Sequence, residues 1–392
     1  MNNTIKIAHI ADCHLRATQY GSKARGHYFY LGLLNAVRKA YVEGVDLILC
    51  AGDLLDSNNP GPGVVMVELN DIDSLLKEYN IPMLVSKGNH DNVSPSWLYQ
   101  FERDGQEHIL LPGICPAVQG NYVVYELSKG ANKPLRIEAY DFTDPETLKE
   151  VAGFNRDPSK IPFADIMMWH GEIKEFCGYP KEEALSMFDF PENAWKLVAM
   201  GDQHIHKYMK RASDGLVVAY PGSTEMCSES EDSDKKMLIY TWYNDGTAWY
   251  IQNIESVKFD TQPVLRNTIN TQEELESILK QMSEEDSNLI YLRYDKRIPD
   301  IVGRLTEVAV ASNHILRLTP LMPDRPDMNS ISRESVVLGP AAFFDDHAEE
   351  LIEDLETRNR IGNLCKDLLD PCTSHRDILN KYCEDRINLI TL

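Results

Sequence analysis

The chain has 392 residues, of which 43% are hydrophobic, and it carries a formal net charge of −22 at pH 7. This length predicts two to three domains, and no stretch approaches the roughly 18 apolar residues of a membrane span. The N-terminal residues lead directly into an apolar run instead of a signal peptide, and the eight cysteines form no Cys-x-x-Cys pair. We therefore expect a cytoplasmic protein with reduced thiols. The negative charge argues against a stand-alone nucleic-acid binder.

Residues 1–250 are predicted to form an α/β domain, because short apolar runs alternate with segments of helical periodicity. The strands expected from these runs lie at about residues 4–11, 45–52, 81–87, 164–170, 196–201, 216–220 and 236–243. Two helices are expected from apolar residues spaced three and four apart, at Tyr30, Leu33, Leu34, Val37 and Tyr41 and at Val65, Leu69, Ile72, Leu76 and Tyr79.

The polar loop at residues 16–28 contains three Lys or Arg residues and no acid, although the chain as a whole is acidic. It follows the first polar motif of the chain directly. Such a loop beside a phosphate site is suited to contact a nucleic-acid backbone. An ordinary solvated loop explains the composition equally well.

Residues 255–325 are predicted to form a separate small α/β domain. Strands are expected at Val264, at 289–292 and at 315–318, with a helical pattern over 301–310. Thr271 and Glu274 have the spacing of a capping box, which predicts that a helix begins there. Several prolines then separate this domain from residues 340–392, a segment of helical periodicity that we expect either to dock on a partner or to pack on its own chain.

Five short polar motifs lie along the first 206 residues, each just past an apolar run. They are Asp12-Cys13-His14, Gly52-Asp53, Gly88-Asn89-His90-Asp91, the lone His170 of Trp169-His170-Gly171, and Gly201-Asp202-Gln203-His204-Ile205-His206. Sites of α/β sheets lie at the carboxyl ends of strands, so the motifs are expected to meet. Residues two apart on an extended segment point the same way, which predicts that Asp12 converges with His14 and His204 with His206.

Together the motifs supply the ligands of a two-metal site: Asp12, His14, Asp53, Asn89, His170, His204 and His206. Two divalent ions ~3.5–4 Å apart can hold a phosphate between them and activate a water for attack. A mixture of imidazole, carboxylate and amide groups suits Mn, Fe or Zn better than Ca or Mg. Each motif alone is typical of an ordinary turn, whereas five in order are hard to reach by chance.

This series of motifs resembles the calcineurin-like metallophosphoesterases and, within them, the SbcD-type DNA repair nuclease subunits. The narrower resemblance rests on the early Asp12-Cys13-His14-Leu15, on residues 51–56 (Ala-Gly-Asp-Leu-Leu-Asp) and on residues 220–225 (Tyr-Pro-Gly-Ser-Thr-Glu). It covers about residues 1–250 well. It implies a two-sheet sandwich flanked by helices, followed by a small α/β cap domain and a C-terminal helical segment.

The resemblance also implies roles for the ligands. Asp12, His14, Asp53 and His206 would hold one ion, and Asp53, Asn89, His170 and His204 the other. His90 would act on the phosphate or the leaving oxygen, with Asp91 as its supporting partner. One departure from the family pattern is visible, because Asp202 and Gln203 stand where many relatives have Gly directly before the first His. We keep His204 and His206 as the pair. Asp202 is either an additional acid outside the ligand shell or a turn residue, and we favour the turn residue.

The function implied by the resemblance is a manganese-dependent DNA nuclease, with exonuclease and endonuclease activity. Its partner would be an SMC-like ATPase of the SbcC type, bound through residues 340–392, and a homodimer stays open. The net charge of −22 leaves two interpretations, because phosphate contacts normally come from Lys and Arg. Either the partner supplies most of the DNA affinity, or the substrate is a small-molecule or nucleotide phosphodiester. A scaffold protein with a vestigial site is a third alternative.

Overall fold

The computed structural model describes residues 3–15, 19, 22–56, 62–91, 97–101, 109–117, 124–129, 133–178, 180–285 and 288–321. The chain divides into two compact units, Met1–Pro320 and Leu321–Leu392. The predicted C-terminal helical segment at 340–392 lies outside the described residues. Within the described ranges, no helix is long and apolar enough to cross a membrane.

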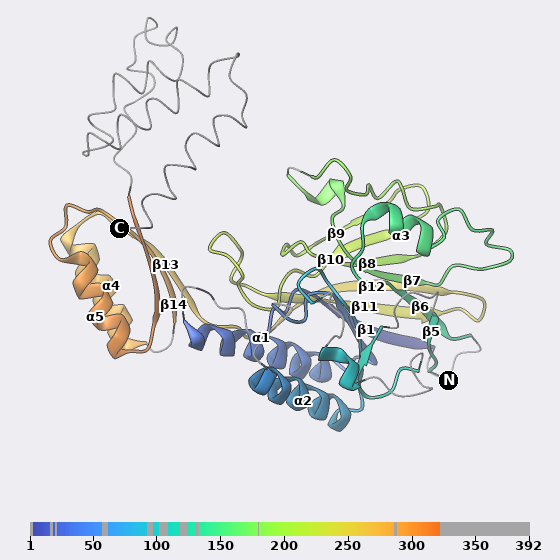
Figure 1. Ribbon diagram of the computed structural model, residues 1–392, viewed down its shortest axis with the longest axis horizontal. Helices are drawn as coiled ribbons and strands as arrows, with labels where there is room; N and C mark the ends of the chain where they lie inside the picture. The colour runs from blue at the N-terminus through green and yellow to red at the C-terminus, as the bar shows by residue number, and fades with distance from the viewer. Residues whose placement is uncertain are drawn as a thin grey trace, which may run out of the picture. The chain divides into compact units, whose positions relative to one another are not determined.

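Two mixed six-stranded sheets form the larger part of the described structure (Figure 1). The first sheet has the order β12 (Trp249–Lys258), β11 (Lys236–Asn244), β1 (Thr4–Ile10), β2 (Leu47–Ala51), β3 (Pro82–Ser86), β4 (Gly113–Pro116). The second has the order β5 (Val124–Leu127), β6 (Leu135–Ala139), β7 (Ile166–His170), β8 (Leu197–Gly201), β10 (Val217–Tyr220), β9 (Lys207–Lys210). The central strands β1 to β4 are mutually parallel, as are β6, β7, β8 and β10, so their carboxyl ends share one edge of each sheet.

The sheets pack face to face and are covered on their outer faces. Along β1, Ile5 and Ile7 belong to the core between the sheets, whereas Ala8 and Ile10 face α1 (Lys23–Val42) and α2 (Pro62–Glu78). Alternation of this kind follows from the period of two in a strand. The outer face of the second sheet packs against α3 (Pro145–Val151) and a cluster of aromatic residues that includes Trp195. The predicted two-sheet sandwich flanked by helices is confirmed.

A third, three-stranded parallel sheet follows, made of β13 (Val264–Ile269), β14 (Leu289–Tyr294) and β15 (Ile315–Pro320). The helices α4 (Gln272–Glu284) and α5 (Ile301–Ala311) pack on it (Figure 1). The capping box predicted at Thr271 and Glu274 is present at the start of α4. Tyr291 belongs to an apolar cluster that also contains Met226 and Tyr28, so a hydrophobic contact joins this sheet to α1 and to the loop between β10 and β11.

The predicted basic loop at 16–28 is interrupted by α1, which begins at Lys23. Arg25 is fully buried, and its Nη2 lies 3.2 Å from Glu225 Oε1 while its Nη1 donates to Gln262 Oε1 at 2.7 Å. A buried and paired guanidinium cannot contact a nucleic-acid backbone, so this residue corrects that part of the prediction. Arg16 lies outside the described residues.

Candidate metal centre

The loops that follow β1 and β2 are joined by backbone hydrogen bonds at the carboxyl edge of the first sheet. Asp12 N–H donates to Gly52 O at 3.1 Å, and His14 N–H donates to Asp53 O at 3.0 Å. The first two motifs are therefore held together by the chain itself, independently of any ligand. This is the arrangement that parallel strands predict for residues at their carboxyl ends.

Three of the predicted ligands have a left-handed backbone. The φ angles are 52° at Asp12, 45° at His14 and 50° at Asp53, which cost about 1–3 kcal/mol each for residues with a Cβ. Strand β1 ends at Ile10, so Asp12 and His14 do not converge by strand alternation as the sequence pattern suggested. Tight turns aim them at the centre, and such strain is typical of functional sites.

The glycines of two motifs are required by close packing around the ligands. A Cβ on Gly52 would overlap the Nδ1 of His170, and its φ of 86° also favours glycine. A Cβ on Gly88 would overlap the carboxylate of Asp53. The Gly-Asp and Gly-Asn-His patterns thus reflect space that the ligand side chains occupy.

The inner group of the centre consists of Asp12, Asp53 and His170, whose ligand atoms all lie within 4.8 Å of one another. His170 Nε2 lies 3.4 Å from Asp53 Oδ2 and 2.9 Å from Asn89 Oδ1. His170 Nδ1 lies 2.9 Å from the carbonyl oxygen of Ala51, which can only accept, so Nδ1 carries a proton. In the neutral ring the lone pair of Nε2 then faces the carboxylates, as metal ligation requires.

The charges of the inner group call for a cation. Burial opposes protonation of His170, but the hydrogen bond to Asp53 and the charges of Asp12 and Asp53 outweigh it and raise the pKa of His170 to about 9. Asp12 is fully buried, and its Oδ2 has no hydrogen-bond partner. An orphaned carboxylate oxygen is costly in a protein interior unless it is paired or bound to a metal. The inner residues therefore fit a divalent ion.

The outer group consists of His14, His204 and Cys227. The Nε2 atoms of the two histidines lie 3.2 Å apart, and His14 Nε2 lies 3.9 Å from Asp53 Oδ2. His204 Nδ1 lies 2.9 Å from Glu231 Oε1. Burial opposes protonation of His204, but the contacts with Cys227 and Glu231 raise its pKa to about 11. Asp53 thus stands between the two groups, as expected of a bridging carboxylate.

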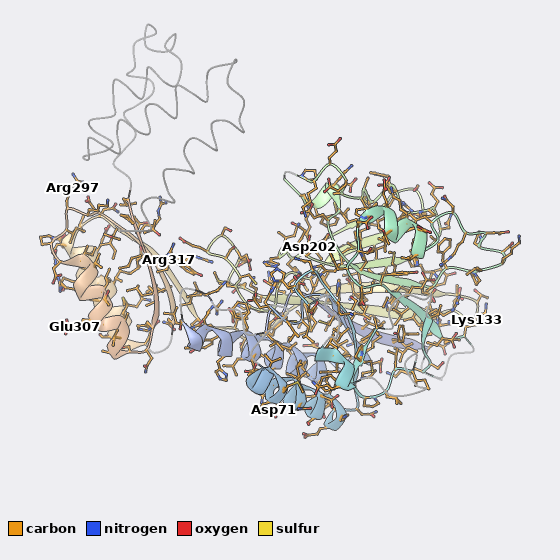
Figure 2. All side chains as sticks on the ribbon, viewed as in Figure 1. Asp71, Lys133, Asp202, Arg297, Glu307 and Arg317 are labelled. Carbon is orange, nitrogen blue, oxygen red and sulfur yellow. The ribbon has the colours of Figure 1, made fainter. Side chains whose placement is uncertain are left out.

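The structure places His206 outside the centre, contrary to the sequence expectation. Its Nδ1 lies 2.8 Å from Pro221 O and its Nε2 lies 2.7 Å from Ser256 Oγ, so both ring nitrogens are engaged. Asp202, labelled in Figure 2, lies at the centre in its place. Its Oδ1 is 3.7 Å from His170 Nε2, and its N–H donates to Asp12 Oδ1 at 3.0 Å.

The supposed insertion before His204 is explained by this geometry. Strand β8 ends at Gly201, and the chain turns at Asp202, where φ is 95°. In a Gly-His-x-His pattern beginning at Gly201, Asp202 stands at the first histidine position and His204 at the second. In that register, a carboxylate would occupy the place of the first imidazole, and His206 would lie beyond the motif.

His90 lies on the wall of the centre with its side chain 43% exposed. Its Nε2 is 4.0 Å from Asp53 Oδ2, and its Nδ1 is 2.7 Å from Asp56 O. Asp91 does not support the His90 ring as the sequence suggested. Its carboxylate accepts the N–H groups of Gly88 at 2.6 Å, Leu54 at 2.8 Å and Leu55 at 3.2 Å, which fixes the third motif to the second.

A cavity of about 300 Å³ opens onto the centre. Its described lining residues are His14, Gln19, Asp53, Asp56, Asn89, His90, Asp202, His204 and Cys227. Three of them are aspartates, and none of these lining residues is Lys or Arg. A phosphate group would meet net negative charge here unless cations are bound.

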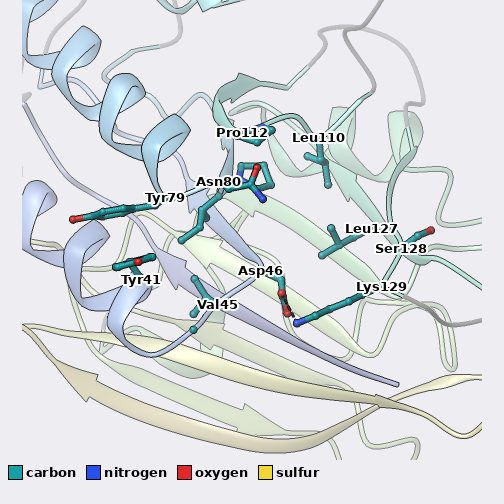
Figure 3. A pocket seen from close by; sticks show the side chains of 13 residues that line it. Tyr41, Val45, Asp46, Tyr79, Asn80, Leu110, Pro112, Leu127, Ser128 and Lys129 are labelled. Carbon is teal, nitrogen blue, oxygen red and sulfur yellow. Dashed lines mark hydrogen bonds and ion pairs between the residues drawn. The ribbon is translucent and has the colours of Figure 1, made fainter. Parts of the chain in front are cut away.

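A second hollow, of about 460 Å³, lies at the opposite ends of the strands, where Val45 and Asp46 precede β2 and Ile81 precedes β3 (Figure 3). Tyr41 and Tyr79 stack at its rim with ring centroids 3.9 Å apart. Among its described lining residues, one ion pair is present, between Lys129 Nζ and Asp46 Oδ1 at 2.6 Å. Its described lining contains no histidine or cysteine, unlike that of the centre.

Sequence reasoning missed four residues of the centre: Asp56, Asp202, Cys227 and Glu231. Asp202 was visible as a departure from the motif, but its side chain was not expected to face the ligands. Cys227 and Glu231 lie in the loop between β10 and β11, which has no strand or helix periodicity. The preceding Pro221-Gly222-Ser223 run was the available signal that this loop returns to the site.

Comparison with known proteins gives concordant matches. Residues 5–206 match the calcineurin-like phosphoesterase family. The chain is 30% identical over 254 residues to the DNA double-strand break repair protein Mre11 of Methanosarcina acetivorans, covering 63% of this chain and 38% of that protein. It is 25% identical over 292 residues to the protein of the same name from Sulfurisphaera tokodaii, covering 72% and 70%.

The chain therefore spans well under two thirds of the first of these relatives. A dimetal phosphatase from Danio rerio is similar in structure at a TM-score of 0.39 and 13% identity, over 65% of this chain and 99% of that chain.

Proposed function

The chain belongs to the calcineurin-like phosphoesterase family, and on this premise we propose that it is the metal-dependent nuclease subunit of a DNA repair complex. The relatives named as DNA double-strand break repair proteins support DNA as the substrate. The observation that carries the proposal is the acidic cavity. Asp53, Asp56 and Asp202 line it without a lysine or arginine among its described walls, so it can admit a phosphodiester only through bound cations.

The proposed ligand sets follow the family pattern with one substitution. Asp12, His14, Asp53 and His204 would hold one ion. The other would be held by Asp53, Asn89, His170 and Asp202, the last in place of a histidine. When bound, two such ions stabilise charge on both the attacking and the leaving oxygen of a phosphodiester. The mixed ligand set makes Mn²⁺ the first ion to test, ahead of Fe²⁺ and Zn²⁺.

His90 is the residue that we assign to proton transfer. Its Nδ1 faces the carbonyl oxygen of Asp56 and must donate there, which leaves Nε2 directed towards the cavity. Because the side chain is 43% exposed, substrate can reach this nitrogen. In the doubly protonated ring, Nε2 would donate a proton to the leaving oxygen or hold the phosphate by a hydrogen bond, and the ring would return to the neutral form with its proton on Nδ1.

The net charge of −22 supports a partner that supplies most of the affinity for DNA. We propose an SMC-like ATPase of the SbcC type for this role, docked through residues 340–392, which lie outside the described part of the chain. The sheet of β13, β14 and β15 with its two helices would act as the cap that shapes access to the site. Three features stay predictions: a homodimer, a cytoplasmic location, and the domain boundaries at residues 250, 255, 325 and 340.

A nuclease assay tests the proposal. The purified chain is given linear and hairpin duplex DNA with Mn²⁺, with and without the cognate ATPase, next to the Asp53→Asn variant. Cleavage that requires Mn²⁺ and Asp53, and that the ATPase stimulates, is the expected result. Hydrolysis of a small phosphodiester without any DNA cleavage would favour the small-molecule alternative. A protein without stoichiometric metal would favour the scaffold.

A further inference from the structure

Cys227 lies on the wall of the cavity and belongs to no sequence motif of the site. Its Sγ and ring nitrogens of His14 and His204 all lie within 4.8 Å of one another. These are three ligand atoms of the kinds that bind transition metals most tightly, one thiol and two imidazoles. The cysteine therefore adds a softer donor to the outer group of the centre.

The spacing of the two histidine nitrogens in this group suits ligation of one cation. Their Nε2 atoms are 3.2 Å apart, and two nitrogens on a tetrahedral ion with bonds of about 2.0–2.1 Å lie about 3.3–3.4 Å apart. His14 is buried, and its Nδ1 lies 3.4 Å from Asp56 Oδ1 without forming a hydrogen bond. A shared proton can satisfy the facing nitrogens in the ion-free protein, and a cation can replace it.

One carboxylate positions both His204 and Cys227. Glu231 Oε1 accepts the Nδ1–H of His204 at 2.9 Å, which leaves the Nε2 lone pair on the cavity side. Its Oε2 accepts the backbone N–H of Cys227 at 3.1 Å and is itself fixed by Lys235 Nζ at 2.6 Å. The Cys227 thiol contacts His204 and lies 3.5 Å from Glu225 O. The backbone hydrogen bond to Glu231 therefore holds its sulfur beside the two imidazoles.

We propose that Cys227 is a ligand of the outer ion and that it gives this half of the centre a preference for a thiophilic cation such as Zn²⁺ over Mn²⁺. The inference rests on the metal site of the proposed function and deepens it. On binding, the S–H bond breaks and the proton leaves to water, while both electrons stay on sulfur and form the bond to the cation. No group is oxidised or reduced. With Cys227, the outer ion would have one thiolate and two imidazoles beside the carboxylates of Asp12 and Asp53, which favours Zn²⁺. The inner ion would have three oxygen ligands and a single imidazole, which suits Mn²⁺.

Cobalt spectroscopy on the full chain tests this assignment. Metal-stripped protein is titrated with Co²⁺, and the thiolate-to-cobalt charge-transfer band in the near ultraviolet is recorded. The band should appear in the wild type and in Cys177→Ser, a control at another partly exposed free cysteine. It should vanish in Cys227→Ser while the visible cobalt bands remain. Zn²⁺ affinity should fall at least about tenfold in that variant, and Mn²⁺ affinity should change little.

Cobalt binding without the charge-transfer band, or a band retained in Cys227→Ser, would overturn the cysteine assignment and leave the nuclease proposal standing. A chain that binds no Co²⁺ at all would overturn both. If Cys227→Ser does not fold, the wild type still decides. Mass spectrometry after alkylation should show Cys227 protected by Zn²⁺ and not by Mn²⁺, and equal labelling under both conditions contradicts the inference.

Discussion

The ligands of the inner group are placed by strand ends, whereas two of the three in the outer group, His204 and Cys227, are placed by more exposed loops. Asp12, Asp53 and His170 are at most 2% exposed and come within two residues of the ends of β1, β2 and β7. His204 and Cys227 are partly exposed and depend on Glu231, which lies in the loop between β10 and β11. The inner group is thus part of the fold, and the outer group is a more adjustable addition to it.

Because of this difference, the inner ligands are constrained by the fold, whereas the outer ligands can change with less effect on it. The inner residues Asp12 and Asp53 have left-handed backbones, and Gly52 and Gly88 leave no room for a Cβ beside His170 and Asp53. Substitutions there are expected to affect folding and both ions together. Substitutions in the outer group should change metal affinity or metal choice while the fold persists.

The largest effect is expected from Asp53→Asn. The carboxylate lies between the groups, with Oδ2 3.4 Å from His170 Nε2 and 3.9 Å from His14 Nε2. Loss of its charge should weaken both ions and lower DNA cleavage by 10³-fold or more, on the order of the largest single-group electrostatic effects. Metal analysis of the purified variant checks this, with exposed Asp71→Asn as the control (Figure 2). Two tightly retained ions per chain would rule out the bridging role.

His90→Gln should separate catalysis from metal binding. The imidazole is on the cavity wall and belongs to neither proposed ligand set. Cleavage should fall by about 10²–10⁴-fold, the usual range for a general acid, while both ions stay bound. Rate measurements at saturating metal, paired with metal analysis, give the answer. A fully active variant would remove His90 from the chemistry.

Asp202→Ala and His206→Ala form a pair that tests the corrected motif. Asp202 Oδ1 faces His170, whereas both nitrogens of His206 are engaged elsewhere. Metal affinity should fall by about 10–100-fold or more in Asp202→Ala and by little in His206→Ala. Isothermal titration with Mn²⁺ measures both. The reverse ranking would restore His206 as the ligand.

Glu231→Gln should act on the outer group alone. Burial opposes ionisation of Glu231, but its contacts with His204 and Lys235 hold its pKa at about 2, so the carboxylate is charged at neutral pH. The amide cannot hold the His204 ring as firmly, and affinity for one ion should fall about 10-fold while the other is retained. Stoichiometric metal titration distinguishes one weakened site from two. Equal weakening of both would contradict the division into groups.

The smallest effect is expected from His9→Gln, on the pH dependence of the free energy of unfolding. His9 is fully buried in β1 between Met200 O and Tyr240 Oη, and burial lowers its pKa to about 3. The unfolded chain takes up this proton below pH 6.5 and the folded chain does not, so stability falls as the pH drops through this range. Between pH 7 and pH 5 the contribution is about 2 kcal/mol. Urea unfolding of His9→Gln should show that much less acid sensitivity than the wild type.

The sequence predicted those parts of the structure that repeat a local pattern. The seven strands expected in residues 1–250 are present, and so are both long helices and the capping box of α4. Strands β4, β5, β6, β9 and β12 were not predicted. Strands β5, β9 and β12 are largely exposed or half-buried, so they lack the buried apolar run from which the other strands were predicted.

Within the centre, the strand-end residues Asp12, Asp53, Asn89 and His170 lie together where the motifs indicated. The motif spacing was matched to histidines, so His206 was predicted as a ligand. In the structure, the turn after Gly201 directs the side chain of Asp202 towards the site instead. Cys227 could not be found from sequence, since its position depends on a loop that returns over the site from a distant part of the chain.

The buried carboxylate of Asp91 has a consequence for motion. It accepts the backbone N–H groups of Leu54 and Leu55, which lie in one loop 37 and 36 residues away, and that of Gly88 in its own turn, all of them buried contacts. The amides of Leu54, Leu55 and Gly88 should therefore exchange with solvent deuterium as slowly as those of a central strand, although they lie in loops. The loops that follow β2 and β3 should therefore move together as one unit, carrying Asp53 and Asn89 with them.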